Sequence, residues 1–270
     1  MKDFLYAPVV AELADTCANM YRLGWDERNG GNISVLLNEN EITEYIDPRN
    51  VLRSIPIGFS CREMAGKYLL LTGTGKFFKN VSKEPAANLG LIRIDESGET
   101  AEVLWGFSDG GKFTSELPTH LMTHAARLQA DPEHRVVTHC HPTHLLAMTY
   151  VHELDARSIT RDLWRMSIES IMTFPDGLGV MPWRLCGTVE IGAETAHLMR
   201  SYRLVIWGMH GIYGAGKTLD ETFGLIETVE KAAQIYMLTA HLPRVNTITD
   251  EQLRRTAEYL GLPYRRDWLE

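Results

Sequence analysis

Apolar positions first recur at helical spacing and then alternate with polar ones. Residues 5–23 carry apolar side chains on one face, which predicts an amphipathic helix that Gly24 ends. The pair Gly30-Gly31 is typical of a turn, and the alternation over residues 33–37 predicts a strand directly after it. The chain therefore opens with a helix, a glycine turn and a strand.

The middle of the chain holds most of the predicted strands. Residues 39–66 are mixed and polar, and they form either a long excursion or a few short elements. A buried strand is predicted at 68–72, and residues 91–95 and 101–105 flank a turn as an antiparallel hairpin. The β-rich segment 135–141 predicts a further strand.

Helices bracket and separate these strands. Helices are predicted over 118–130, 142–150, 188–201, 218–241 and 249–260, and short strands over 171–174 and 203–207. Strands and helices do not alternate cleanly. The pattern therefore predicts an α/β fold, with 1–270 as a single domain and a central, mainly antiparallel or mixed sheet flanked by helices.

Composition narrows the class of protein. The chain has 270 residues, of which 44% are hydrophobic and 23% charged, as in globular proteins. A net charge of −8 argues against nucleic-acid binding, and no apolar run is long enough for a membrane span. The cysteines are widely spaced, and the N-terminus has no signal-peptide layout. We expect a cytoplasmic protein without a four-cysteine zinc site.

The histidines are unevenly distributed. Of the ten histidines, seven lie within residues 120–152. His139 and His141 share one face of the predicted strand, where two imidazoles can share a metal ion, and Cys140 points to the opposite face. The alternative is a pair of structural histidines. A third ligand could be His210, which ends a strand beside a glycine.

The other histidines of the crowded segment give weaker indications. His120 and His124 have the i, i+4 spacing that can chelate a metal, but the glutamate of the H-E-x-x-H motif is missing. We therefore expect them on a solvated helix face. His144 follows the helix-opening Pro142, and the sequence leaves its direction open.

A phosphate-binding loop is a competing hypothesis. Residues 211–218 match G-x-x-x-x-G-K-[ST] and lie between a predicted strand and a helix, as in nucleoside triphosphatases. Such proteins continue with parallel strands, one of which ends in a magnesium-binding aspartate. After Thr218 the chain offers only helices and a loop, which disfavours this hypothesis.

Three polar turns could hold an anion. Residues 29–32 (NGGN) precede a strand, and residues 72–76 (TGTGK) follow one, so both expose backbone N–H groups beside small polar side chains. Residues 114–116 (TSE) precede a helix whose positive end suits a phosphate. Taken singly, each is better explained by ordinary turn chemistry.

Together these segments resemble the class II aldolase/adducin family. The resemblance rests on GWDERNGGNIS, TGTGKFFKNV, PAANLG, TSELPTH, HCHPTHLLAMTY, FPDGLGVMPW, HGIYGAG and TLDETFGLIETVEKAAQI. These segments extend from about residue 24 to residue 237. The resemblance assigns the glycines after His210 to the loop of a metal ligand rather than to a nucleotide site.

The resemblance implies a zinc aldolase. Its zinc ligands would be His139, His141 and His210, and Glu116 would move a proton at the metal as acid/base. Glu169 would act on the aldehyde end of the substrate across a subunit boundary. The implied phosphate-binding residues are Asn29, Asn32, Thr74, Gly75 and Ser115, with Thr74 where serine is usual.

The implied reaction is retro-aldol cleavage of L-rhamnulose 1-phosphate to dihydroxyacetone phosphate and L-lactaldehyde. It needs no lysine Schiff base, so Lys76 and Lys217 would be accessory. The implied assembly is a homotetramer with active sites between subunits. The alternatives are a relative that cleaves another sugar phosphate such as L-fuculose 1-phosphate, a 4-epimerase, and a non-catalytic adducin-like scaffold. Because relatives of the scaffold type lack the zinc histidines, their presence here disfavours the scaffold.

Overall fold

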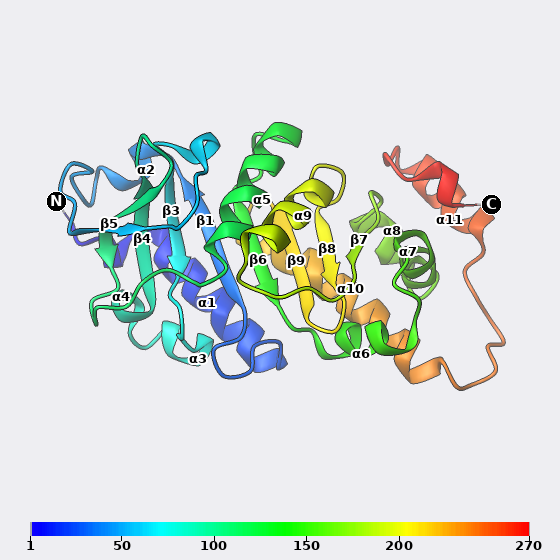
Figure 1. Cartoon of the computed structure of the whole chain (residues 1–270). Helices are drawn as coiled ribbons and strands as arrows, with labels where there is room; N and C mark the ends of the chain where they lie inside the picture. The colour runs from blue at the N-terminus through cyan, green and yellow to red at the C-terminus, as the bar shows by residue number, and fades with distance from the viewer. Residues whose placement is uncertain (1, 270) are drawn as a thin grey trace.

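The computed structural model describes residues 2–269, and its nine strands form one sheet (Figure 1). The strands are β1 (Asn32–Leu37), β2 (Arg53–Pro56), β3 (Tyr68–Thr72), β4 (Leu89–Ile94), β5 (Thr100–Gly106), β6 (Val136–Cys140), β7 (Gly179–Met181), β8 (Leu204–Trp207) and β9 (Gly211–Gly216). Their order is β2-β5-β4-β3-β1-β6-β9-β8-β7. Among these, β7 pairs with β8 in parallel and every other pair is antiparallel, so the predicted mixed, mainly antiparallel sheet is confirmed.

Helices cover both faces of the sheet (Figure 1). On one face lie α1 (Pro8–Leu23), α3 (Phe78–Val81) and α10 (Leu219–Thr239), and α6 (Thr143–Val151) packs on α10. On the other face lie α5 (Leu117–Ala130) and α9 (Val189–Met199). Beyond the β7 edge lie α7 (Ala156–Trp164), α8 (Ile168–Thr173) and α11 (Asp250–Tyr259), and the short α2 (Glu39–Ile42) and α4 (Pro85–Asn88) join strands.

Strand β1 shows how the sequence selects the two faces. Ile33, Val35 and Leu37 belong to the same apolar core as α1 and α10. The alternate positions Asn32 and Ser34 therefore face α5, because successive side chains of a strand point to opposite sides. All six residues are buried, so the predicted alternation separates two buried faces rather than a buried face from a solvated one.

Most predicted elements are found within one or two residues of their expected ends. The first helix ends at Gly24 with φ +77°, and the hairpin of β4 and β5 and the capping box of α11 are present. Residues 39–66 form α2, β2 and a 3₁₀ turn at Arg62–Met64. That residues 1–270 are one domain stays a prediction, which the single sheet favours. Among the described residues, no helix combines the length and apolarity that a bilayer crossing requires.

The strand predicted over residues 171–174 is wrong. Residues 168–173 form helix α8, and Ile171 and Phe174 are buried without joining the sheet. The Trp164 indole N–H donates to the Phe174 carbonyl at 3.2 Å and ties α7 to this helix. A short apolar run does not by itself separate a strand from a helical turn, and here the packing of α7 and α10 decides.

The expected solvated face of His120 and His124 is also wrong. Both side chains are fully buried between α5 and the sheet, where each approaches the Ser34 hydroxyl. Two histidines one helical turn apart face the same way. The sequence pattern gives that spacing, but not which side of α5 meets β1.

The nucleotide-binding hypothesis fails on backbone geometry. Gly211–Gly216 is the buried strand β9, hydrogen-bonded between β6 and β8, so its N–H groups belong to the sheet and not to a phosphate cradle. Residues 211–216 are thus a strand, not the loop that the resemblance implied. The Lys217 ammonium contacts the carboxylates of Glu133 and Asp131.

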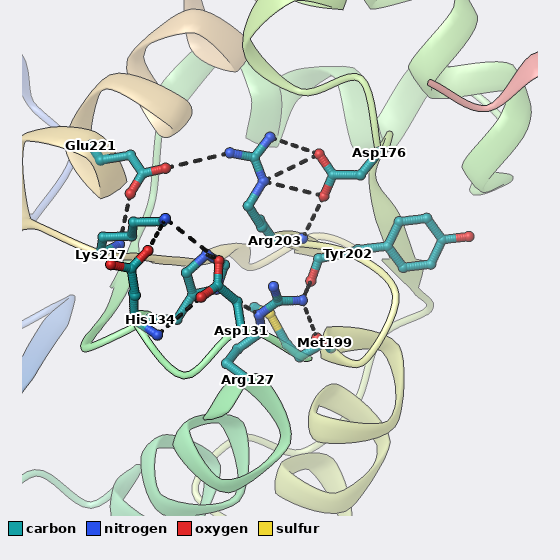
Figure 2. A network of polar contacts seen from close by, with 10 residues as sticks. Arg127, Asp131, His134, Asp176, Met199, Tyr202, Arg203, Lys217 and Glu221 are labelled. Carbon is teal, nitrogen blue, oxygen red and sulfur yellow. Dashed lines mark hydrogen bonds and ion pairs between the residues drawn. The ribbon is translucent and has the colours of Figure 1, made fainter. Parts of the chain in front are cut away.

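A polar network fastens the C-terminal end of α5 to the sheet (Figure 2). The buried Arg127 guanidinium donates to His134 Nδ1 at 2.9 Å and to the Met199 carbonyl at 2.7 Å. Arg203, at the start of β8, pairs with Asp176 and lies 3.6 Å from Glu221. The opposite end of α5 carries Glu116, so this network fixes the helix that presents the candidate site.

Candidate metal and acid–base site

Three histidines converge where β6 ends and β9 begins. His139 lies in β6, His141 directly follows the last residue of that strand, and His210 lies in the turn between β8 and β9. One ring nitrogen from each lies within 4.8 Å of the other two. The structure thus brings together the three predicted metal ligands.

Hydrogen bonds hold two of these rings with Nε2 turned toward the cluster. His139 Nδ1 lies 3.0 Å from the Ile212 carbonyl, and His141 Nδ1 lies 3.0 Å from the Glu27 carboxylate. Both partners only accept, so both Nδ1 atoms carry the proton. In neutral rings with this tautomer, the two Nε2 lone pairs face each other 3.2 Å apart, an arrangement that repels unless a cation lies between them. This donor set fits a divalent metal held by imidazoles, with outer hydrogen bonds that orient each ring.

Burial keeps the His139 and His210 imidazoles neutral. Desolvation lowers the pKa of His139 well below its ordinary value, and the neighbouring His141 and His210 lower it further. Desolvation also lowers the pKa of His210, against the opposing effect of Glu116. Since a metal binds the neutral ring, the site is prepared for a cation at neutral pH.

Two glycines let the backbone approach the rings. A Cβ at Gly211 would lie 2.4 Å from the Cys140 carbonyl oxygen and 2.9 Å from His141 Cδ2. A Cβ at Gly30 would lie 2.9 Å from His141 Cε1. Any other residue at Gly211 would therefore displace β6, the strand that carries His139. This agrees with the expectation that a glycine beside His210 leaves room for close approach.

Glu116 lies beside the histidines and is buried. It precedes α5, is 7% exposed, and its Oε2 lies 3.8 Å from His139 Nε2. The Asn32 amide donates to Oε2 at 3.0 Å, and the buried Tyr213 hydroxyl donates to the same oxygen. This geometry provides one carboxylate for proton transfer at the edge of the histidine cluster.

The predicted phosphate-binding segments lie side by side. Gly73 and Phe113 form a bridge, and the Thr74 N–H donates to the Lys112 carbonyl at 2.9 Å, so Thr74 and Gly75 adjoin the segment that carries Ser115. Asn32 joins them through Glu116, and Asn29 lies in the exposed turn just before it. Their role as phosphate ligands stays a prediction. The Asn32 amide is also engaged by His120, so it has a structural task besides.

Glu169 is placed elsewhere. It is exposed on α8, which lies beyond the β7 edge of the sheet (Figure 1). Neither of the two clusters of metal-binding groups found among residues 2–269 includes it. Within one chain, therefore, Glu169 is not among the groups that gather at the histidines.

One residue at the site was missed from the sequence. The exposed Cys186 brings its Sγ within 4.8 Å of a Glu116 oxygen and a His210 nitrogen. It lies in the loop between β7 and α9, where the following Gly187 approaches the Ser115 carbonyl. Nothing in the local sequence indicates this contact, because the loop reaches the site only through the packing of α9 on α5.

The remaining histidines of the crowded segment serve the fold. His144 Nδ1 lies 2.7 Å from a Glu230 oxygen and ties α6 to α10, which settles the direction that the sequence left open. His152 Nε2 lies 3.0 Å from an Asp162 oxygen, and His134 accepts from Arg127. The crowding of histidines within residues 120–152 therefore indicates only part of the site, namely His139 and His141.

The fold and this site together define the class. The chain belongs to the class II aldolase and adducin family, because the family model for the class II aldolase and adducin N-terminal domain matches residues 11–237. A sugar-phosphate aldolase from Thermotoga maritima has a solved structure that superposes with a TM-score of 0.76 at 30% identity, covering 88% of this chain and 97% of that one.

Among curated proteins, the chain is similar to rhamnulose-1-phosphate aldolases over nearly its whole length. It is 53% identical over 269 residues to the enzyme of Listeria monocytogenes serotype 4b (strain CLIP80459), covering 99% of this chain and 98% of the relative. It is 52% identical over 269 residues to that of Enterococcus faecalis, covering 99% and 96%.

Replacing Gly211 by alanine is expected to destroy the metal site. The added Cβ has no room beside the Cys140 carbonyl and the His141 ring, so the ligands must move apart. Metal content of the purified variant, measured by plasma mass spectrometry, should fall well below one ion per chain. Gly224→Ala is the control, because nothing lies within 4 Å of a Cβ there and it should keep its metal. A fully loaded G211A protein would contradict this steric argument.

Alkylation is expected to modify Cys186 alone and to block the site. Burial raises the pKa of Cys61 to about 11, and it raises the pKa values of Cys17 and Cys140 well above their ordinary value, which suppresses the reactive thiolates. N-ethylmaleimide should therefore label one thiol per native chain, found by peptide mass spectrometry, and should abolish catalysis. Cys186→Ser should stay active and resist the reagent. A protein labelled at Cys186 with full activity would show that the thiol does not reach the site.

Proposed function

We propose that this chain is a zinc-dependent aldolase that cleaves L-rhamnulose 1-phosphate to dihydroxyacetone phosphate and L-lactaldehyde, in the degradation of L-rhamnose. The observation that carries the proposal is the set of three converging imidazoles with a buried carboxylate beside them. The similarity to named rhamnulose-1-phosphate aldolases over 99% of the chain supports this substrate.

The protein's own groups divide the reaction between two ends of the substrate. A divalent cation held by His139, His141 and His210, zinc in this proposal, would act as a Lewis acid that stabilises the negative charge left by carbon–carbon cleavage. Glu116 delivers a proton to the carbon that carries this charge. Its Oε2 is held by two donors, so the carboxylate is oriented before substrate arrives.

The phosphate anchors the substrate at the adjoining turns. Asn29, Asn32, Thr74, Gly75 and Ser115 would offer backbone N–H groups, amides and hydroxyls. Ser115 lies just before α5, and Thr74 is hydrogen-bonded to the segment that leads to it. Binding energy from the phosphate, remote from the reacting carbons, is then available to position the bond that breaks. Lys76 pairs with Asp109 and takes no covalent part.

Glu169 removes the proton from the hydroxyl that becomes the aldehyde. Its exposed position on α8 supports a role in the active site of a neighbouring subunit, within a homotetramer. The partners in this proposal are thus a sugar phosphate and further copies of the chain, without nucleic acid or membrane. A cytoplasmic location stays a prediction.

Cleavage of L-rhamnulose 1-phosphate, followed by coupled reduction of dihydroxyacetone phosphate, tests the proposal. We expect activity that a chelator abolishes and zinc restores. Glu116→Gln should lower kcat by at least about 100-fold with its metal retained, because the proton donor is lost. Full activity in metal-free protein would overturn the mechanism. Faster cleavage of L-fuculose 1-phosphate would show that this sugar phosphate is the substrate. Epimerisation at C4 would show that the reaction is not a cleavage.

Subunit mixing tests the position of Glu169. Glu116→Ala and Glu169→Ala homo-oligomers should each be inactive. If Glu169 acts in a neighbouring subunit, co-assembly of equal amounts should restore roughly a quarter of the sites, those in which a Glu116-bearing chain meets a Glu169-bearing neighbour. Two copies of the same variant carried through the same mixing serve as the control. No recovery in verified mixed oligomers would place Glu169 outside this role.

A further inference from the structure

A chain of buried polar side chains leads away from Glu116 into the core. His124 Nε2 lies 2.8 Å from the Ser34 hydroxyl, which lies 2.6 Å from His120 Nδ1. His120 Nε2 contacts the side-chain oxygen Oδ1 of Asn32, and the side-chain nitrogen Nδ2 of Asn32 donates to Glu116 Oε2 at 3.0 Å. Ser34, His120 and His124 are fully buried, and none of them is a predicted metal or substrate ligand.

The protons of this chain have one consistent arrangement. The Glu116 carboxylate only accepts, so the Asn32 nitrogen faces it and the Asn32 oxygen faces His120. His120 must then donate from Nε2, which leaves its Nδ1 to accept from the Ser34 hydroxyl. The Ser34 oxygen in turn accepts from His124 Nε2. Burial lowers the pKa of His120 to about 4, so the ring is neutral and carries this single proton.

The arrangement gives the two oxygens of Glu116 different tasks. Oε2 receives two donors, from Asn32 and from Tyr213. Among the described residues Oε1 has no hydrogen-bond partner. An oxygen that already accepts two hydrogen bonds is the poorer place for a proton, so the proton that Glu116 carries belongs on Oε1.

We infer that His120 is a positioning residue for Glu116: it holds the Asn32 amide in the orientation that makes Oε2 the acceptor and Oε1 the proton carrier. Ser34 and His124 fix the tautomer of His120 that this requires. The inference rests on the proposed role of Glu116. It assigns a task to two histidines that belong to neither the metal set nor the surface.

Solvent exchange of dihydroxyacetone phosphate isolates this task. In deuterium oxide the enzyme should exchange one carbon-bound hydrogen of this product without any aldehyde, because only Glu116 moves that proton. Deuterium incorporation followed by NMR gives the rate, and its dependence on concentration gives a KM.

His120→Phe keeps a ring but removes both nitrogens. We expect its exchange and cleavage kcat to fall about 100-fold, as for a misplaced catalytic group, with the metal retained. Any rise in KM should be much smaller, because Asn32 is one of five proposed phosphate-binding residues. His120→Gln keeps an N–H that can reach Asn32 and should recover most of the rate. His152→Phe is the control: it removes another histidine whose side chain is largely buried, but its partner Asp162 lies on α7, away from Glu116, so Tm should fall while both rates stay unchanged.

A second variant covers a failure of His120→Phe to fold. Ser34→Ala leaves the contact between His120 and Asn32 but removes the hydroxyl behind it, and we expect a drop of about tenfold in exchange with unchanged KM. Wild-type rates in a folded, metal-loaded H120F or S34A protein would overturn the inference, as would a loss shared equally by H120F and H120Q. Failure of the proposed function is distinct, since the wild type would then neither exchange nor cleave.

Discussion

The site depends on the register of three neighbouring strands. Antiparallel pairing sets Asn32 of β1 opposite His139 of β6, and His139 opposite Tyr213 of β9. Partners in such a row project from the same face, so an amide, an imidazole and a phenol meet beneath the start of α5. The Tyr213 ring stacks on His139 with centroids 4.5 Å apart. A slip of one residue in either pairing would turn a member of this row to the opposite core.

Helix α5 completes what the strands begin. Its first residues place Glu116 over the row, and its next turns insert His120 and His124 against β1. At its far end the Arg127 guanidinium donates a hydrogen bond to the carbonyl of Met199, the last residue of α9 (Figure 2). A helix fixed at both ends cannot slide along the sheet. The separation between carboxylate and imidazoles is thus set by the packing of whole elements and not by a flexible loop.

The sequence predicted most of this fold and the inward-facing histidines, and its failures have physical causes. Alternation over residues 135–141 places His139 and Cys140 on opposite faces, a local property that a single strand decides. The contact of Cys186 with Glu116 and the burial of His120 depend on which elements pack together, which periodicity does not specify. The strand predicted at 171–174 and the P-loop match at 211–218 failed similarly: each is a short pattern that two backbones can satisfy, and the neighbouring elements choose between them.

Burial explains how an acidic chain can serve a phosphate substrate without a basic surface. The net charge of −8 belongs to the whole chain, whereas burial lowers the pKa of His139 and His210 and keeps these two imidazoles neutral. A divalent cation at the proposed metal site would bring its full positive charge to a place that also holds Glu116. Backbone N–H groups and hydroxyls at the adjoining turns need no charge to bind an anion. At the proposed site the metal would supply the positive charge that neutral imidazoles lack. The residues that hold it would therefore also determine where the substrate's negative charge can be accommodated.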